Sequence, residues 1–223
     1  MTSIRQSSCR AISQQIGRFV MPASKSFTVV AEDCWAGMLY RFLYRPYMTP
    51  FAGTWIDPTT YLDFLETLHL QPQYELEFYR DDRFAYPTAF FGPARVGFMH
   101  AETRMIAQQS WTRRMARCKL AQSHVKIDFR KEGFGEHDIK RWNKLKLPRS
   151  VAFIDQAIAD EFPVVHNKLI VDCDTEFFVT LKKSLSTFCW WRWLKSNGGP
   201  THLTAVDLYL NRWLLEELQR ITG

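Results

Sequence analysis

Short apolar runs alternate with helix-forming segments as far as residue 154, and this order limits the fold more than any other feature of the chain. Residues 27–31 (FTVVA) predict a buried strand that leads directly into a helix predicted at residues 35–45. Apolar runs at residues 124–129 and 150–154 lie on either side of another predicted helix. Strands and helices joined by short connections are typical of a mostly parallel sheet covered by helices. We therefore expect an α/β protein with a three-layer α/β/α arrangement.

The remaining segments also fit this pattern. Strands are predicted at residues 51–56 and 74–79 and as a pair within 88–100, and helices at 59–69, 102–118 and 136–145. Residues 164–174 (VVHNKLIVDCD) predict one strand or a strand pair. Three regions follow. We expect a basic helical extension at residues 1–25, the α/β domain at residues 26–174, and a helical segment packed on it at residues 175–223, with helices at 175–195 and 203–221.

The charge and the cysteines exclude several classes of protein. The 223 residues include 29 Lys and Arg and 23 Asp and Glu, and the net charge of +6 is too mild to predict nucleic-acid binding. The five cysteines form no C-x-x-C pair, and an odd number favours free thiols in a cytoplasmic protein. No apolar stretch approaches the ~20 residues needed to cross a bilayer.

Cys34 lies at the predicted junction of the first strand and the first helix. The N–H groups and the dipole at a helix N-terminus favour a thiolate, which a cysteine nucleophile requires. The neighbouring carboxylates Glu32 and Asp33 oppose it, and a small packed residue is the alternative. The two acids are expected beyond the carboxyl end of a strand, where open α/β sheets bind ligands. There an acid can bind sugar hydroxyls, act as a general base or hold a divalent cation.

His100 ends the apolar run VGFMH and is expected at another strand end. It can accept a proton from a substrate hydroxyl or from Cys34, with Glu102 orienting it, and the alternative is a histidine that caps a strand or helix. Arg114 and Arg117 lie on one predicted helix with a tryptophan, and clustered guanidinium groups suit phosphate. A solvated basic face gives the same pattern.

Two more features concern the last third of the chain. Asp172 and Asp174 would point the same way on a strand, which makes them weak candidates for metal ligands. Residues 182–195 combine tryptophans with basic side chains, as helices at a membrane surface do. Three tryptophans so close together cannot all face one core, so we expect at least one to be exposed to a membrane, a partner or a sugar. Packing is the alternative.

The region from Cys34 to Ile154 resembles a bacterial family named domain of unknown function nineteen-nineteen, whose members are commonly labelled exopolysaccharide biosynthesis proteins. The matching segments, in order, are EDCWAG, YMTPFAGTWI, YLDFLETL, GFMHA, the spacing of Trp111, Arg114 and Arg117, and HVKIDF. Acids replace the two asparagines of the family's first motif, and Gly97 replaces a histidine of its GFMHA-like motif.

The resemblance implies a three-layer α/β fold and a role in building or decorating surface polysaccharide, but no particular reaction. It points to Cys34, His100, Trp111 and Arg114 as site residues, and Trp35 belongs to the first matching motif. Together with the strand-end residues, it leads to a first hypothesis of a transferase. Its substrate would be a carbohydrate or a lipid-linked glycan, and it would work as a peripheral protein at the cytoplasmic face of the membrane.

Two donors fit this transferase. With acyl-CoA, Cys34 or a sugar hydroxyl would attack the thioester and His100 would act as the base. With a nucleotide sugar, Arg114 and Arg117 would bind the diphosphate, and an acid such as Asp33 would supply a base or hold a divalent cation. The second hypothesis is a non-catalytic assembly protein that binds glycans or partners through exposed tryptophans.

Overall fold

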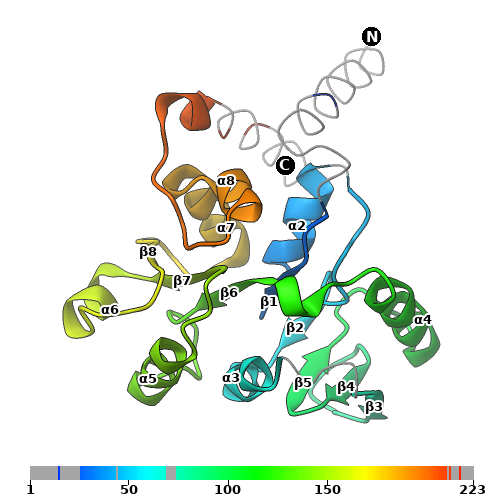
Figure 1. The fold of residues 1–223 in the computed structure, drawn as a ribbon. Coiled ribbons are helices and arrows are strands. Elements are labelled where there is room, and N and C mark those ends of the chain that lie inside the picture. Colours follow the sequence, from blue (N-terminus) through cyan, green and yellow to red (C-terminus); the bar gives the residue numbers. More distant parts are fainter. Residues whose placement is uncertain are drawn as a thin grey trace.

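The computed structural model describes residues 15, 26–43, 45–68, 74–209, 211 and 216. Its strands form two four-stranded sheets, one in the order β1-β6-β7-β8 and one in the order β2-β5-β4-β3 (Figure 1). The extension predicted at residues 1–25 lies outside the described residues except for residue 15. Most of the helix predicted at residues 203–221 also lies outside them.

The first sheet is parallel throughout. Its strands are β1 (Val29–Ala31), β6 (His124–Asp128), β7 (Ser150–Ile154) and β8 (Lys168–Ile170). Each neighbouring pair runs in the same direction, so the carboxyl ends of these strands lie at one end of the sheet. Ligand sites in open α/β sheets occur at that end.

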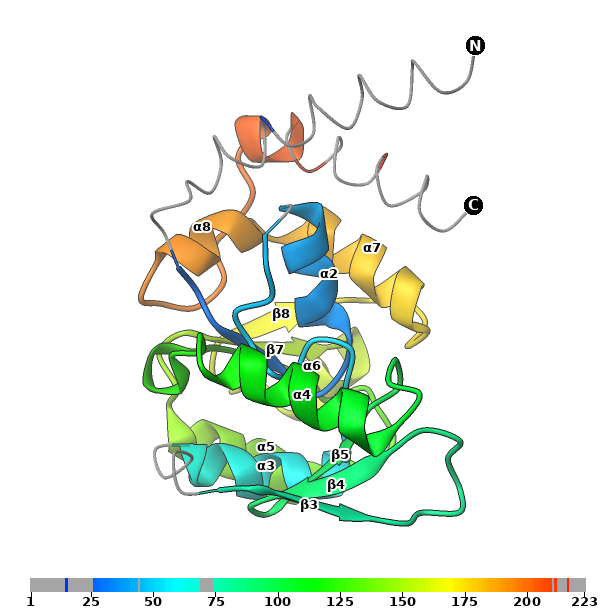
Figure 2. The same cartoon turned by 90° about the vertical axis from the view of Figure 1, so that its right-hand side faces the viewer.

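Helices cover both faces of the parallel sheet (Figures 1 and 2). One face carries α2 (Trp35–Phe42), α7 (Phe177–Thr187) and α8 (Trp190–Lys195), and the other carries α3 (Pro58–Glu66) and α5 (Glu136–Leu145). The connections contain α4 (Arg104–Met115), η2 (Leu120–Gln122) and α6 (Gln156–Glu161). The predicted α/β class is therefore confirmed.

The second sheet is antiparallel, which the sequence analysis did not predict. It contains β2 (Trp55–Ile56), β3 (Leu76–Tyr79), β4 (Thr88–Phe91) and β5 (Ala94–Gly97). A two-residue turn joins β4 to β5, and at that turn Gly92 has a φ of +56°. Such a turn can only join antiparallel strands, because a parallel pair needs a long crossover. The prediction that all strands up to residue 154 share one mostly parallel sheet is thus wrong for these four.

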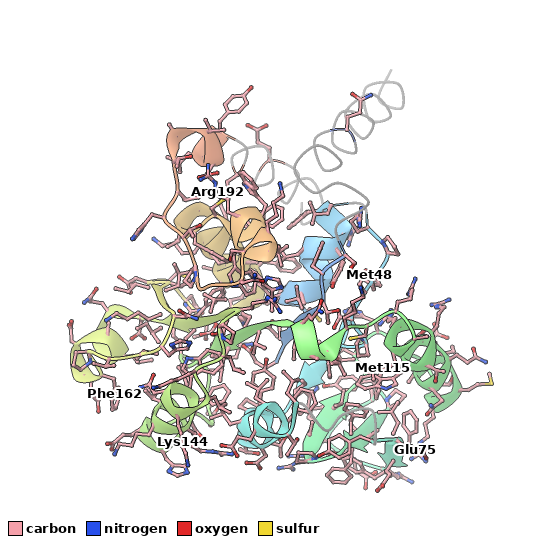
Figure 3. All side chains as sticks on the ribbon, in the orientation of Figure 1. Met48, Glu75, Met115, Lys144, Phe162 and Arg192 are labelled. Atoms are coloured by element: carbon pink, nitrogen blue, oxygen red, sulfur yellow. The ribbon has the colours of Figure 1, made fainter. Side chains whose placement is uncertain are left out.

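Alternating side chains of the parallel strands divide the core into two clusters. Val151 and Phe153 pack against α2, α7 and α8, whereas Ala152 and Ile154 pack against α3, α5 and the second sheet. This period of two is what a strand buried on both faces requires. Figure 3 shows side chains filling the spaces on both faces of the sheet.

The tryptophans of residues 182–195 are largely buried. Trp190 and Trp193 are 1% and 0% exposed, and Trp191 is half-buried beneath the cations of Arg192 and Lys195. Trp190 and Trp193 therefore do not form the exposed surface that the second hypothesis requires, because α7 and the turn at Phe188 enclose them in the core, and of the three tryptophans only Trp191 is partly exposed. No helix in the described part of the chain is both long and apolar enough to cross a membrane.

The burial of His124 at the start of β6 leads to a pH-dependent stability. The side chain is 4% exposed, its Nε2 lies 3.1 Å from the Trp193 carbonyl oxygen, and burial lowers its pKa from 6.5 to about 4. Between these values the unfolded chain binds a proton that the folded chain excludes. We expect this histidine to lower the free energy of unfolding by about 3 kcal/mol as the pH falls from 6.5 to 4.

Urea denaturation at several pH values measures this contribution. The variant His124→Gln should show a flatter pH dependence between 6.5 and 4 than the unmodified protein. The control variant His137→Gln removes an exposed histidine of α5 and should leave the slope unchanged. Equal slopes for the unmodified protein and His124→Gln would contradict the assignment.

Candidate functional site

The candidate site lies at the carboxyl end of the parallel sheet, where Cys34 follows β1. It is a cavity of about 510 Å³ that combines apolar walls with a thiol, an imidazole and cations. Its lining residues are Asp33, Cys34, Met38, Arg41, Trp55, Met99, His100, Lys131, Thr175, Phe177, Phe178 and Thr180. The sequence analysis singled out three of them, Asp33, Cys34 and His100, and the structure brings these three together.

Cys34 is the N-cap residue of α2 and faces His100. Its Sγ lies 3.8 Å from His100 Nε2 and 3.9 Å from the Thr54 carbonyl oxygen. Burial, with a further contribution from Asp33, raises the thiol pKa to about 11. These effects outweigh the helix N-terminus, which would lower the thiol pKa, and Cys34 is a protonated thiol at neutral pH. A thiol of this kind becomes a nucleophile when a neighbouring base removes its proton during attack.

His100 is exposed to solvent, and its ring lies against a tight turn. Gly53 has a φ of +78°, and a Cβ there would lie 3.2 Å from His100 Cδ2, so the turn and the imidazole ring pack closely. Arg114 donates a hydrogen bond to the Ala52 carbonyl oxygen within the same turn and lies 4.8 Å from the Tyr47 ring. Arg114 is therefore a support of the turn that carries Gly53.

A buried group of charges lies behind the thiol. Lys126 is 0% exposed, and its Nζ lies 2.6 Å from Glu32 Oε1 and 2.9 Å from Asp33 Oδ2. Lys131 also pairs with both acids, at 3.2 Å from Glu32 and in a closer contact with Asp33. The two lysines balance the charge of the two carboxylates, and Glu32 Oε2 is buried without a hydrogen-bond partner among the described residues.

These ion pairs give the two acids different protonation behaviour. Burial raises the pKa of Glu32, against the attraction of its lysines. Burial also acts on Asp33, but Lys126 and Lys131 outweigh it and hold the pKa of Asp33 well below its usual value. Asp33 further accepts a hydrogen bond from the Trp35 backbone N–H at 3.0 Å. Because its oxygens are already bound, Asp33 is poorly placed to act as a general base.

Arg130 connects the sheet to the apolar wall of the cavity. It pairs with Asp128 through two hydrogen bonds of 2.7 and 2.8 Å and donates to Thr180 Oγ1 at 2.7 Å and to the Val171 carbonyl oxygen at 2.7 Å. The pair thus fixes the segment that leads into α7. Phe177 and Phe178, which line the cavity, begin that helix.

Lys126, Lys131 and Arg41 were not among the site residues predicted from the sequence. One signal was available for Lys126: it lies inside the apolar run HVKIDF, so a strand buried on both faces forces its side chain into the core. A buried lysine needs a carboxylate partner, and Glu32 and Asp33 directly follow β1, the strand that pairs with β6. No local signal identified Lys131 or Arg41 as cavity residues.

The other predicted substrate-binding residues lie outside this cavity. Trp35 is 1% exposed and donates to Ser184 Oγ at 3.0 Å, so it is a core residue rather than a ligand contact. Glu32 is enclosed by its lysines. Glu102 is exposed and forms no hydrogen bond with His100 among the described contacts, so the predicted orienting role is not observed.

The arginines and the later acids are also separated from Cys34. Arg117 lines a different cavity, at the opposite end of the sheet. Asp172 and Asp174 are exposed, and Asp174 Oδ1 accepts a hydrogen bond from the Glu176 backbone N–H at 2.9 Å. Within the described ranges, no group of three or more His, Cys, Asp or Glu side chains is arranged to hold a metal ion.

His100 also lines a second, more polar cavity of about 150 Å³. Its polar lining side chains are Tyr47, Thr54, Ser110 and Arg114, and Trp111 forms part of its apolar floor. Trp111 is mainly a core residue, in edge contact with Phe51 and Phe91. His100 therefore lines both cavities, the apolar one that contains the thiol and this more polar one.

A comparison with known families agrees with the motif order of the sequence. The family described as "Domain of unknown function (DUF1919)" matches residues 7–177, which include Cys34, His100 and both lysines of the charge cluster. The chain belongs to this family. The matched segment includes the parallel sheet and the first residue of α7. The cavity is therefore lined almost entirely by residues of the family's domain.

One relative has also been found among curated proteins. It is an uncharacterized protein of Haemophilus influenzae, 24% identical over 130 residues, and the match covers 58% of this chain. The chain spans 62% of the length of that relative.

Proposed function

We propose that this protein is a thiol-dependent acyltransferase that modifies a surface glycan or its lipid-linked precursor. The observation that carries the proposal is the pair of Cys34 Sγ and His100 Nε2, 3.8 Å apart, at the boundary of an apolar and a polar cavity. The 3.8 Å separation is loose, as catalytic hydrogen bonds often are before substrate binds. The glycan acceptor is supported by the resemblance to polysaccharide biosynthesis proteins and by the polar cavity.

The first half-reaction transfers the acyl group to the protein. The Cys34 thiol proton moves to His100 Nε2 while sulfur attacks the carbonyl carbon of a donor thioester such as acyl-CoA. The donor's carbon–sulfur bond then breaks, and the donor thiol leaves with the proton from His100. The oxyanion of the tetrahedral intermediate would form in the cavity that Lys131 lines, with the ammonium group of Lys131 paired to Asp33 and Glu32.

The second half-reaction releases the acyl group to the acceptor. A sugar hydroxyl in the polar cavity gives its proton to His100 and attacks the carbonyl carbon of the Cys34 thioester. The bond between this carbon and Sγ breaks, and Cys34 regains its proton from the imidazolium. A single histidine thus serves both steps because it faces both cavities.

The apolar lining favours acyl transfer over glycosyl transfer. Met38, Trp55, Phe177 and Phe178 offer no hydrogen bonds for a sugar ring beyond the Trp55 indole, and that group already donates to Tyr86 at 2.6 Å. The two arginines predicted to hold a donor diphosphate are not in this cavity. Trp190 is buried, which weakens the second hypothesis of a non-catalytic protein that binds glycans through exposed tryptophans.

We further propose that the protein works at the cytoplasmic face of the membrane, with residues 182–195 toward the lipid. Lys182, Lys183, Arg192 and Lys195 on α7 and α8 are exposed. Cations of this kind are attracted by anionic headgroups, each contributing about 1 kcal/mol near the surface. Contact would therefore be electrostatic, since the neighbouring tryptophans are mostly buried.

Release of free thiol from acyl-CoA tests the proposed donor. We expect a burst stoichiometric with the protein, followed by slow hydrolysis when no glycan is present. Longer acyl chains should react at lower concentration, because each buried CH₂ contributes about 0.8 kcal/mol. UDP-sugars serve as the comparison: release of UDP from them, without thiol release from acyl-CoA, would replace acyl transfer by glycosyl transfer.

A further inference from the structure

A third cavity, lined by several cationic side chains, lies at the amino end of the parallel sheet, opposite Cys34. It has a volume of about 210 Å³. Thr28 just before β1, His124 at the start of β6 and Arg149 just before β7 place it at that end, and Met48, labelled in Figure 3, lies on its wall. Four cationic side chains line it, those of Arg117, Lys119, Arg149 and Lys195, and none of the lining residues is Asp or Glu.

The two half-buried arginines of this cavity differ from others in the protein. Arg130 and Arg141 pair with carboxylates. Arg117 and Arg149 form no ion pair with a described carboxylate, and neither does Lys119. Bringing several cations together without an acid is unfavourable unless an anion joins them.

Individual groups at the cavity are fixed in place by neutral partners. Asn197 Oδ1 accepts from Arg149 Nε and Nη2 at 2.8 and 2.6 Å, which orients the guanidinium without neutralising it. Thr28 Oγ1 accepts from the Lys119 backbone N–H at 2.9 Å. Arg117 Nε is buried and has no hydrogen-bond partner among the described residues, an arrangement that costs free energy.

We infer that this cavity binds a phosphoryl group, with Arg117, Lys119 and Arg149 as its ligands. Guanidinium groups match phosphate oxygens in geometry, and hydrogen bonds between charged partners are stronger than neutral ones. A phosphoryl anion would give Arg117 an acceptor and would neutralise the repulsion among the cations. The site is separate from the Cys34 cavity, so it does not depend on the acyltransferase proposal.

Calorimetric titration of the full chain with inorganic pyrophosphate tests the site. We expect binding that weakens about tenfold or more in Arg117→Gln and in Lys119→Gln, and more in the double variant. Lys119 is exposed and its side chain forms no described hydrogen bond, so this variant should fold normally. Lys182→Gln on α7 is the matched control and should bind as the unmodified protein does.

Two further arms distinguish the source of the phosphoryl group. Vesicles containing phosphatidylglycerol that compete with pyrophosphate would assign the site to a lipid headgroup. Vesicles that do not compete would assign it to a soluble phosphorylated ligand. The inference is overturned if pyrophosphate does not bind, or if it binds the double variant as tightly as the unmodified protein. Cys34→Ser should bind pyrophosphate normally, which separates this test from the acyltransferase proposal.

Discussion

Replacing Cys34 with serine is expected to reduce acyl transfer by at least about a thousandfold. A serine hydroxyl is a much weaker nucleophile, and Asp33 is not free to activate it because Lys126 and Lys131 bind its carboxylate. His100→Asn should reduce the rate by about 10²–10⁴-fold, since it removes the proton acceptor of both half-reactions. The measurement is thiol release from acyl-CoA under single-turnover conditions.

Control variants separate this effect from misfolding. Cys118→Ser removes another half-buried thiol, which lies outside the cavity lining, and should leave the rate unchanged. His137→Asn removes an exposed histidine and should also leave the rate unchanged. If Cys34→Ser retained full activity while Asp33→Asn abolished it, a thiol mechanism would be wrong and the carboxylate would become the reactive group.

Replacing Lys126 with methionine should lower the free energy of unfolding by about 3–5 kcal/mol. The substitution keeps most of the side-chain volume but leaves Glu32 and Asp33 close to each other in the core, with only Lys131 to balance them. Glu32 Oε2 already has no hydrogen-bond partner among the described residues, so no neighbouring donor would replace Lys126. Urea denaturation at pH 7 measures the loss.

The loss caused by Lys126→Met should shrink as the pH falls, because protonation removes the unpaired negative charge. The double variant Lys126→Met with Glu32→Gln should recover part of the stability at pH 7 for the same reason. Lys140→Met is the comparison: its pair with Glu136 is exposed, so the substitution should leave the free energy of unfolding nearly unchanged. If Lys126→Met lowered the free energy of unfolding as little as Lys140→Met does, a structural role of the charge cluster would be contradicted.

Much of the parallel sheet could be predicted from the sequence because its signals are local. The apolar run of β1, the helix at residues 136–145 and the strand at residues 150–154 are confirmed with nearly the same bounds. In the second sheet, the pair β4 and β5 was predictable from the turn at residues 92–93, but the pairing of β5 with β2 and of β4 with β3 was not, because it depends on contacts between distant segments. The helix at residues 175–195 is divided at Phe188, whose extended backbone ends α7, and no Gly or Pro marks that break.

The candidate site could be predicted only in part, because only some of its residues have local sequence signals. Cys34 and His100 were recognised by their positions at segment ends, and the fold brings them together although 66 residues separate them. Their apolar surroundings come from α2, β2 and α7, and no local pattern shows that these elements meet. Arg114 and Arg117 were predicted to lie on one helix, but α4 ends at Met115 between them, so Arg114 supports a turn and Arg117 lines the basic cavity.

The intact mass of the protein after incubation with acyl-CoA, in the absence of acceptor, shows whether an acyl-enzyme forms. We expect an added mass of one acyl group less one hydrogen, located on the peptide that contains Cys34 and removed by neutral hydroxylamine, as a thioester would be. The adduct should be absent from Cys34→Ser and present in Cys118→Ser. Acyl transfer to a glycan without any adduct on Cys34, together with an active Cys34→Ser variant, would contradict the account.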